Sequence, residues 1–345
     1  MAGNEKLHIA KEKRNSEYYT EYSTISNEIS KIRSLFRGKS VYCNCDDPSW
    51  SNFWRYFHNN FASLGLTRLV STHYQHGSEP SYALIYEGGD DFNMECGKVV
   101  TIYGNDNYTA GDFRSNECLK YLDECDINVT NPPFDLFKEY MAILIEHGKD
   151  FLVLGNQNAV TYKEIFPLIK ENKVWYGESI HSGGVDFRIP DDYDSYSKNV
   201  FMKNGHHYVN LAGIRWFTNL DVPRRHDGLW HINGKFDKTQ AHCYYEGNEE
   251  KYPKYDNYDA INVNKTKEIP IDYDGVMGVP ITFLDKFNPE EFEIIGTLVM
   301  GSAYKKTKVI NPYDYAIPYV NGKKVYARIL IRNRHPIPKE KDKGY

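Results

Sequence analysis

The sequence predicts an α/β protein whose first half forms a largely parallel, doubly wound sheet and whose second half is irregular and rich in short strands. Two observations support this fold class. Between residues 39 and 175, short apolar runs alternate with stretches of helical spacing, which is the pattern of repeated βαβ units. After Trp175, Gly, Asp, Asn and Tyr become frequent, helix signals become few, and Tyr208–Leu220 is the longest β run.

The individual elements follow in order along the chain. Apolar residues at helical spacing predict helices at about 24–36, 50–61, 118–122, 135–147 and 162–172. Apolar runs predict strands at 41–45, 67–72, 126–130 and 150–155. The β runs at 82–86 and 99–103, separated by Gly88-Gly89-Asp90-Asp91, predict an inserted hairpin, and Asn321-Gly322 predicts another near the C-terminus.

Length and composition bound the organisation of the protein. The 345 residues are enough for a large domain with a second, smaller one. We expect residues 1–178 to form the first domain and residues 179–345 the second, with some later strands completing the first sheet. The polar N-terminus and the absence of a long apolar window predict a cytoplasmic protein without a signal peptide or membrane span. The six cysteines show no zinc-like spacing, so we expect reduced thiols and no metal site.

Charge is distributed unevenly along the chain. The formal net charge is −5, yet residues 301–345 hold eleven Lys or Arg against three acids. Such asymmetry predicts a basic face for a polyanion, although a solvated tail explains residues 339–345 equally well. We expect basic side chains of this region to hold phosphates of such a polyanion, which positions it without reading a sequence. The candidates are Lys305, Lys306, Lys308, Arg328, Arg332 and Arg334.

The chemistry centres on Asn131-Pro132-Pro133-Phe134, which lies where a buried strand ends and a helix begins. Ligands bind at that edge of an open α/β sheet. The Asn131 side-chain oxygen and the Pro132 carbonyl can accept the two hydrogens of an exocyclic amine and so make its nitrogen more nucleophilic. The prolines stiffen the loop, and Phe134 offers a stacking face. The pattern favours methyl transfer from S-adenosylmethionine to an amino group, although a Pro-Pro turn without catalytic function is the alternative.

Weaker features suggest a site for the methyl donor. Asp46 and Asp47 follow the first strand and can accept hydrogen bonds from the donor's ribose or amino group, although an Asx turn explains them as well. Asp112 follows a glycine at another strand end and can accept from the donor's adenine amine. Tyr19 and Thr20 are candidates to hold the donor's carboxylate. Phe113 and Phe134 are candidates for the wall of the pocket.

Several stretches resemble the EcoRI-type adenine-specific DNA methyltransferases. They are Glu17–Tyr22, Val41–Pro48, Val129–Phe134, Gly155–Ala159 and Gly278–Leu284. The Cys-Asn-Cys-Asp-Asp-Pro string that ends the second stretch and the Gly-Val-Pro-Ile-Thr-Phe-Leu string of the last are more specific than the tetrad. The resemblance covers most of the chain.

The resemblance implies a Rossmann-like methyltransferase sheet followed by a target-recognition region. It implies that S-adenosylmethionine methylates an adenine flipped out of a short duplex site, within a restriction-modification system, and that the protein acts as a monomer. It also assigns residues by motif. The expected donor-binding residues are Tyr19, Thr20, Cys45, Asp46, Asp47, Pro48, Asp112 and Phe113. The catalytic residues are Asn131, Pro132, Pro133 and Phe134, with Asn156 and Asn158 at the rim of the pocket.

The sequence departs from the wider methyltransferase pattern in two places. Ser49–Phe53 replaces the Gly-x-Gly that usually follows the first strand, and the second strand ends in Thr72-His73-Tyr74 without an acid for the ribose. Asp46 or Asp47 is the expected substitute. Methylation of an rRNA base or of a protein glutamine, and a non-catalytic DNA-binding anti-restriction role, remain alternatives at this point.

Overall fold

The computed structural model describes residues 18–45, 47–89, 97–190, 200–298 and 317–339. The chain divides into two compact units. The first contains the described residues up to Asn156 together with Gly177–Asp221. The second contains Gln157–Tyr176 and the described residues from Val222 onward. This division is based on packing alone. The predicted boundary at residue 178, between a first domain of residues 1–178 and a second of residues 179–345, stays a prediction.

A mixed β-sheet forms the centre of the first unit. Within this unit the strand order is β5-β4-β3-β2-β6-β7-β12. Strands β3, β2, β6 and β7 are parallel, and the strands at both edges are antiparallel to their neighbours. The strands are β2 (Ser40–Cys43), β3 (Arg68–Thr72), β4 (Ser81–Tyr86), β5 (Lys98–Ile102), β6 (Ile127–Thr130), β7 (Asp150–Asn156) and β12 (Ile214–Thr218).

The antiparallel edges correct the expectation of a largely parallel sheet. A parallel neighbour needs a crossover of about a dozen residues or more, whereas β3 and β4 are joined only by residues 73–80. The predicted hairpin is confirmed as β4–β5, and it extends the main sheet. The β run predicted at Tyr208–Leu220 is two strands, because Gly213 has a φ of +74° between β11 (His206–Ala212) and β12.

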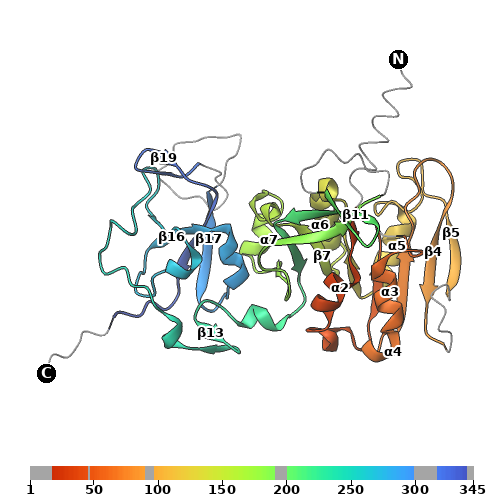
Figure 1. Ribbon diagram of the computed structural model, residues 1–345, viewed down its shortest axis with the longest axis horizontal. Coiled ribbons are helices and arrows are strands. Elements are labelled where there is room, and N and C mark those ends of the chain that lie inside the picture. Colours follow the sequence, from red (N-terminus) through yellow and green to blue (C-terminus); the bar gives the residue numbers. More distant parts are fainter. Residues whose placement is uncertain (1–17, 46, 90–96, 191–199, 299–316, 340–345) are drawn as a thin grey trace, which may run out of the picture. The chain divides into compact units, whose positions relative to one another are not determined.

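Helices of the first unit cover the sheet as the apolar spacing predicts. In α3, Phe53, Trp54 and Phe57 are buried, and the Ser51 hydroxyl accepts from the Phe53 N–H at the helix start. Right-handed connections place α3, between β2 and β3, on one face and α6, between β6 and β7, on the other (Figure 1). The helical elements are α2 (Tyr22–Ile29), η1 (Arg33–Phe36), α3 (Asn52–Asn59), α4 (Phe61–Leu64), α5 (Asn116–Glu124), η2 (Phe134–Leu136) and α6 (Phe137–Glu146).

A small antiparallel sheet completes the first unit. Its order is β1-β9-β11-β10, with β1 (Tyr19–Thr20), β9 (Gly184–Arg188), β10 (Val200–Lys203) and β11. Phe187 of β9 is fully buried and contacts the ring of Phe134. Because β1 pairs with β9, this contact links both the N-terminal strand and the segment beyond residue 180 to the end of β6.

The second unit is built from short strands and turns. Its main sheet has the order β15-β16-β20-β17, and the predicted Asn321-Gly322 hairpin is confirmed as β18–β19. The strands are β8 (Trp175–Tyr176), β13 (His231–Ile232), β14 (Lys235–Phe236), β15 (Ile261–Asn262), β16 (Val276–Pro280), β17 (Phe292–Leu298), β18 (Tyr319–Val320), β19 (Lys323–Lys324) and β20 (Arg328–Asn333).

Helical segments of the second unit are brief. The helix predicted at 162–172 is shorter than expected, because Pro167 cannot continue an existing helix and instead lies in the first turn of α7. These segments are η3 (Gln157–Thr161), α7 (Phe166–Lys170), η4 (Pro223–His226), η5 (Lys238–Gln240), η6 (Thr266–Glu268) and η7 (Ile281–Lys286). Among the residues that the structure describes, no helix combines the length and the apolarity needed to span a bilayer.

Candidate active site

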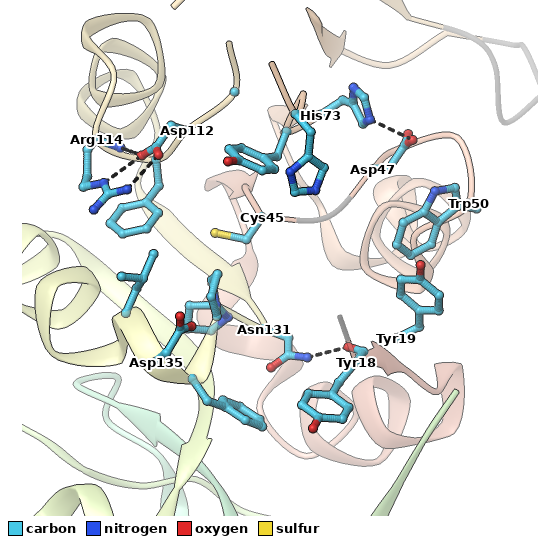
Figure 2. Close-up of a pocket in the computed structure, with 18 residues that line it drawn as sticks. Tyr18, Tyr19, Cys45, Asp47, Trp50, His73, Asp112, Arg114, Asn131 and Asp135 are labelled. Carbon is cyan, nitrogen blue, oxygen red and sulfur yellow. Dashed lines mark hydrogen bonds and ion pairs between the residues drawn. The ribbon is translucent and has the colours of Figure 1, made fainter. Parts of the chain in front are cut away.

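A cleft of about 370 Å³ opens at the carboxyl ends of β2, β3 and β6 in the first unit (Figure 2). The sheet order changes direction between β2 and β6, which is the switch point where open α/β sheets bind ligands. The volume falls within the usual range for small-molecule sites. The lining residues are Tyr18, Tyr19, Cys45, Asp47, Trp50, His73, Tyr74, His76, Gly111, Asp112, Phe113, Arg114, Asn131, Pro132, Pro133, Phe134, Asp135 and Leu136.

A buried polar network fixes the end of β6 against the end of β2. The Tyr140 hydroxyl of α6 donates to Asn128 Oδ1 at 2.6 Å and also contacts Asn44 Oδ1. The Thr130 hydroxyl donates to the Asn44 carbonyl. Burial raises the pKa of Tyr140, so this hydroxyl keeps its proton. The backbone at Asn131, which follows Thr130, is therefore held in a fixed position.

The two ends of the Asn131 side-chain amide have different surroundings. Its Nδ2 donates to the main-chain carbonyl of Tyr18 at 2.8 Å (Figure 2). Its Oδ1 is buried and has no hydrogen-bond partner among the described residues. A buried acceptor without a partner costs about 1–3 kcal/mol, and such groups are rare outside functional sites. The cleft thus contains an acceptor that is available to a bound donor.

Aromatic rings surround Phe134 on two sides. Its ring stacks on Tyr18 with a centroid distance of 5.7 Å and an interplanar angle of 25°. Phe187 approaches Phe134 edge-on at 6.3 Å and Tyr18 at 5.8 Å. Planar stacking of this kind is the geometry that a flat heterocycle would also adopt on Phe134.

Asp47 reaches from the end of β2 to the end of β3. Its Oδ2 lies 3.4 Å from His73 Nε2, and its Oδ1 accepts from the Tyr82 hydroxyl and the Ser49 N–H, each at 2.8 Å. The bond to Ser49 is the Asx turn that the sequence left open. Asp47 also lines the cleft, so the turn leaves it within the site, and its contact with the donor stays a prediction. Asp46 lies outside the described residues.

Asp112 is held by a close approach of two loops. A Cβ on Gly111, which has a φ of +80°, would lie 1.8 Å from the His73 carbonyl oxygen, so only glycine fits there. The Asp112 carboxylate accepts from Arg114 Nε and Nη2, both at 2.9 Å. Arg114 also reaches Glu139 at 2.9 Å and covers the Phe113 ring. Hydrogen bonding to Asp112 raises the pKa of Arg114, so the guanidinium keeps its charge.

The other predicted donor-binding residues lie in or beside the cleft. Tyr19 lines it and packs against Trp50 with a centroid distance of 4.2 Å. Cys45 also lines it, with a φ of +67° that is unusual for a residue with a side chain. Thr20 and Pro48 are buried and are not lining residues, but the Thr20 hydroxyl has no hydrogen-bond partner among the described residues.

Other predicted substrate-binding residues have different environments. Asn156 ends β7 and is not a lining residue of the cleft, whereas Asn158 belongs to the second unit. Arg328 is only 8% exposed, and its guanidinium donates to Asn262, Tyr326 and Ala327. Its predicted contact with a phosphate stays a prediction, although Nε and Nη1 are already engaged inside the unit.

The remaining basic candidates differ in their surroundings. Arg332 and Arg334 are exposed, with Arg332 3.6 Å from Glu293 and Arg334 donating to the Pro289 carbonyl. Lys305, Lys306 and Lys308 lie outside the described residues.

Some lining residues gave no functional signal in the sequence. Trp50 was expected only as the first residue of a helix at about 50–61, yet it precedes α3, is 42% exposed and lines the cleft. Its position two residues after Asp47-Pro48 could have indicated this. Tyr18 and Arg114 were not predicted as site residues, because only folding brings them to the cleft, and Asp135 gave no signal of its own although it follows Phe134 directly.

The fold and the cleft define the class of α/β methyltransferases that act on an amino group, with the tetrad at one strand end and carboxylates beside it. The chain belongs to the family described as adenine-specific methyltransferase EcoRI, whose model matches residues 6–334. It is therefore an adenine-specific DNA methyltransferase of type II restriction-modification, with S-adenosylmethionine as methyl donor. The family implies a Rossmann-like fold for the mixed sheet. This membership decides against the RNA, protein and non-catalytic alternatives.

Curated relatives match nearly the whole chain. The chain is 45% identical over 341 residues to Type II methyltransferase M.EcoRI of Escherichia coli, covering 96% of this chain and 98% of that protein. It is 40% identical over 335 residues to Type II methyltransferase M.MpnI of Mycoplasma pneumoniae, covering 95% and 98%. No solved structure matches the chain.

Proposed function

We propose that the cleft takes the target adenine, flipped out of a short duplex site, and that Asn131, Pro132 and Phe134 prepare its 6-amino group for methylation. The observation that supports this most directly is the buried Asn131 Oδ1, which has no hydrogen-bond partner in the part of the chain that the structure describes. An amino group supplies the hydrogen that this acceptor lacks. Flipping costs a few kcal/mol, about the amount that base stacking and pocket hydrogen bonds return.

The tetrad acts on the amino group through hydrogen bonds and shape. Asn131 Oδ1 accepts one hydrogen and the Pro132 carbonyl accepts the other, which draws the nitrogen toward a tetrahedral form with a more available lone pair. Pro132 and Pro133 have no N–H to compete for these acceptors and keep the loop stiff. Phe134 stacks on the base. No general base is required beforehand, because the nitrogen becomes acidic only after alkylation.

The remaining lining residues suit S-adenosylmethionine, which supplies an electrophilic methyl group on a positively charged sulfur. Three aspartates line the cleft, and two of them, Asp47 and Asp112, fit a cationic ligand with hydroxyl and amine donors. We assign Asp112, with Phe113 as the adjoining wall, to the donor's adenine. Tyr19 and the unpartnered Thr20 hydroxyl are assigned to its carboxylate. Cys45 before Asp47 and Pro48 after it shape the backbone on either side of this residue, and Asp46 belongs to the same proposed segment.

Asp47 is the proposed ribose contact. The second strand lacks the usual terminal acid, but Asp47 Oδ2 lies 3.4 Å from His73, the residue that follows that strand. A carboxylate is thus present beside the end of β3 although it comes from the end of β2. This supports Asp47 as the substitute for the missing acid.

DNA contacts outside the cleft are proposed for the region from 179 to 345, with residues 1–178 as the catalytic domain. Exposed Arg332 and Arg334 support phosphate contacts, and Lys305, Lys306 and Lys308 share the same basic stretch. Asn156 and Asn158 are proposed at the rim, next to the base. We further propose that the enzyme acts as a monomer, because modification of a duplex requires one catalytic cleft for each flipped base. A cytoplasmic location is proposed as well.

The test is made in cells that lack DNA methyltransferases. The wild type and Asn131→Ala are expressed, and modified bases are mapped in the genomic DNA by native single-molecule sequencing. We expect N6-methyladenine at one short motif for the wild type and unmodified DNA for the variant, with DNA binding largely retained. Methylation by Asn131→Ala at the wild-type level contradicts the proposed role of the tetrad.

A further inference from the structure

The shape of an asparagine side chain does not determine which end of its amide faces a cavity. Exchanging Oδ1 and Nδ2 leaves the shape almost unchanged, but it replaces an acceptor by a donor. An adenine amino group presents hydrogens, so an amide with Nδ2 toward the base would place donor against donor. The prolines that fix the backbone after Asn131 do not fix this rotation. A second hydrogen-bond partner of the amide has to select the productive orientation.

We propose that Tyr18 is the positioning residue that makes this selection, through its main-chain carbonyl. This inference rests on the proposed role of Asn131 and deepens it. A carbonyl oxygen only accepts, so the contact of 2.8 Å from Asn131 to Tyr18 requires Nδ2 at that end. The opposite orientation would place Oδ1 against the carbonyl oxygen. The acceptor Oδ1 is therefore directed away from Tyr18, where it is buried and where none of the described residues forms a hydrogen bond with it.

The Tyr18 carbonyl is itself held from several sides. Tyr19 and Thr20 pair antiparallel with Arg188 and Phe187 of β9. Asn52 Nδ2 of α3 donates to the Thr20 carbonyl at 2.8 Å. The Tyr18 ring stacks on Phe134 and contacts Phe187. A segment 113 residues before the tetrad is thus fixed against it.

The first variant is Asn131→Asp, which has nearly the same shape but can donate to the Tyr18 carbonyl only when its carboxyl is protonated. The ionised form would place a negative oxygen against the carbonyl oxygen. We expect single-turnover methylation by this variant at low pH and a decline of about tenfold for each pH unit above the pKa of the new carboxyl. The wild type, with a neutral amide, lacks this decline and is the control.

The second variant weakens the carbonyl without changing a side chain. Replacing Tyr19 by its α-hydroxy acid converts the peptide bond between residues 18 and 19 to an ester, whose carbonyl is a poorer acceptor. The matched control is the α-hydroxy analogue of Asp150, which weakens the Lys149 carbonyl and so its bond of 2.9 Å from Asn219 Nδ2, at the start of β7 and outside the cleft. We expect the first ester to lower kcat by about two- to tenfold, the loss for one weakened neutral hydrogen bond. Donor affinity should be unchanged, and the control should retain the wild-type kcat.

The outcomes separate this inference from the proposed function. Full activity of Asn131→Ala contradicts the role of Asn131 itself. An inactive Asn131→Ala together with a pH-independent Asn131→Asp and a fully active ester at 18–19 overturns the role of Tyr18 alone. A pH-dependent Asn131→Asp and a slower ester at 18–19, with a normal control ester, support it.

Discussion

The ion pair between Arg114 and Asp112 offers a quantitative test of the cleft. Arg114 donates to Asp112 through Nε and Nη2 at 2.9 Å and to Glu139 through Nη1 at 2.9 Å. Arg114→Gln leaves the Asp112 carboxylate, whose side chain is 9% exposed, without its counter-charge. Breaking a fully buried pair costs about 3–5 kcal/mol. Because the Arg114 side chain is 25% exposed, we expect a smaller loss of about 2 kcal/mol.

The assay for Arg114→Gln is thermal unfolding together with calorimetric titration of S-adenosylmethionine. A loss of this size should lower the Tm by about 4–8 °C in a unit of this length, and the donor Kd should rise about tenfold as Asp112 loses its fixed orientation. Arg33→Gln is the control, since Arg33 donates to Ser63 at an exposed site. A Tm within about 1 °C of the wild type would refute the energetic argument. A lower Tm with an unchanged donor Kd would refute the role of Asp112.

Three further expectations concern residues around the cleft. Asp47→Asn should raise the donor Kd about tenfold in calorimetry, since an amide accepts a hydroxyl less strongly than a carboxylate; the surface variant Asp123→Asn should leave it unchanged. Burial and the Asp47 carboxylate raise the pKa of Tyr82 to about 12. The folded state therefore retains a proton that the unfolded chain loses near pH ~10, and stability falls as the pH rises from about 10 to about 12. Tyr82→Phe should flatten that fall in urea unfolding, and an equal slope for both proteins contradicts the assignment. Burial raises the pKa of Cys125 to about 12, whereas Cys45 lines the cleft. N-ethylmaleimide at about pH 8 should therefore modify Cys45 and spare Cys125. Bound S-adenosylmethionine should protect Cys45, and peptide mass spectrometry that finds no protection argues against its place in the donor site.

The course of the central strands could be predicted from sequence because it depends on local patterns. Apolar runs marked β2, β3, β6 and β7, and the helical spacing of Phe53, Trp54 and Phe57 marked α3. The same patterns do not encode strand direction at the edges of the sheet. The antiparallel direction of β4 against β3, and of β12 against β7, was therefore not anticipated. Their direction depends on the length of the connection and on pairing partners that are distant in the sequence.

The sequence by itself determined the class of the protein and the position of the tetrad at the end of a buried strand. It did so because strand, turn and helix signals are local and because stretches such as Val41–Pro48 and Gly278–Leu284 resemble one family. Only the tertiary structure decided how the polar groups pair across the cleft. The Tyr18 carbonyl meets Asn131, Asp47 reaches His73, and Arg328 turns inward. These contacts join segments that are mostly far apart in the sequence, and the direction of a hydrogen bond is set by where the backbone places its donor and acceptor.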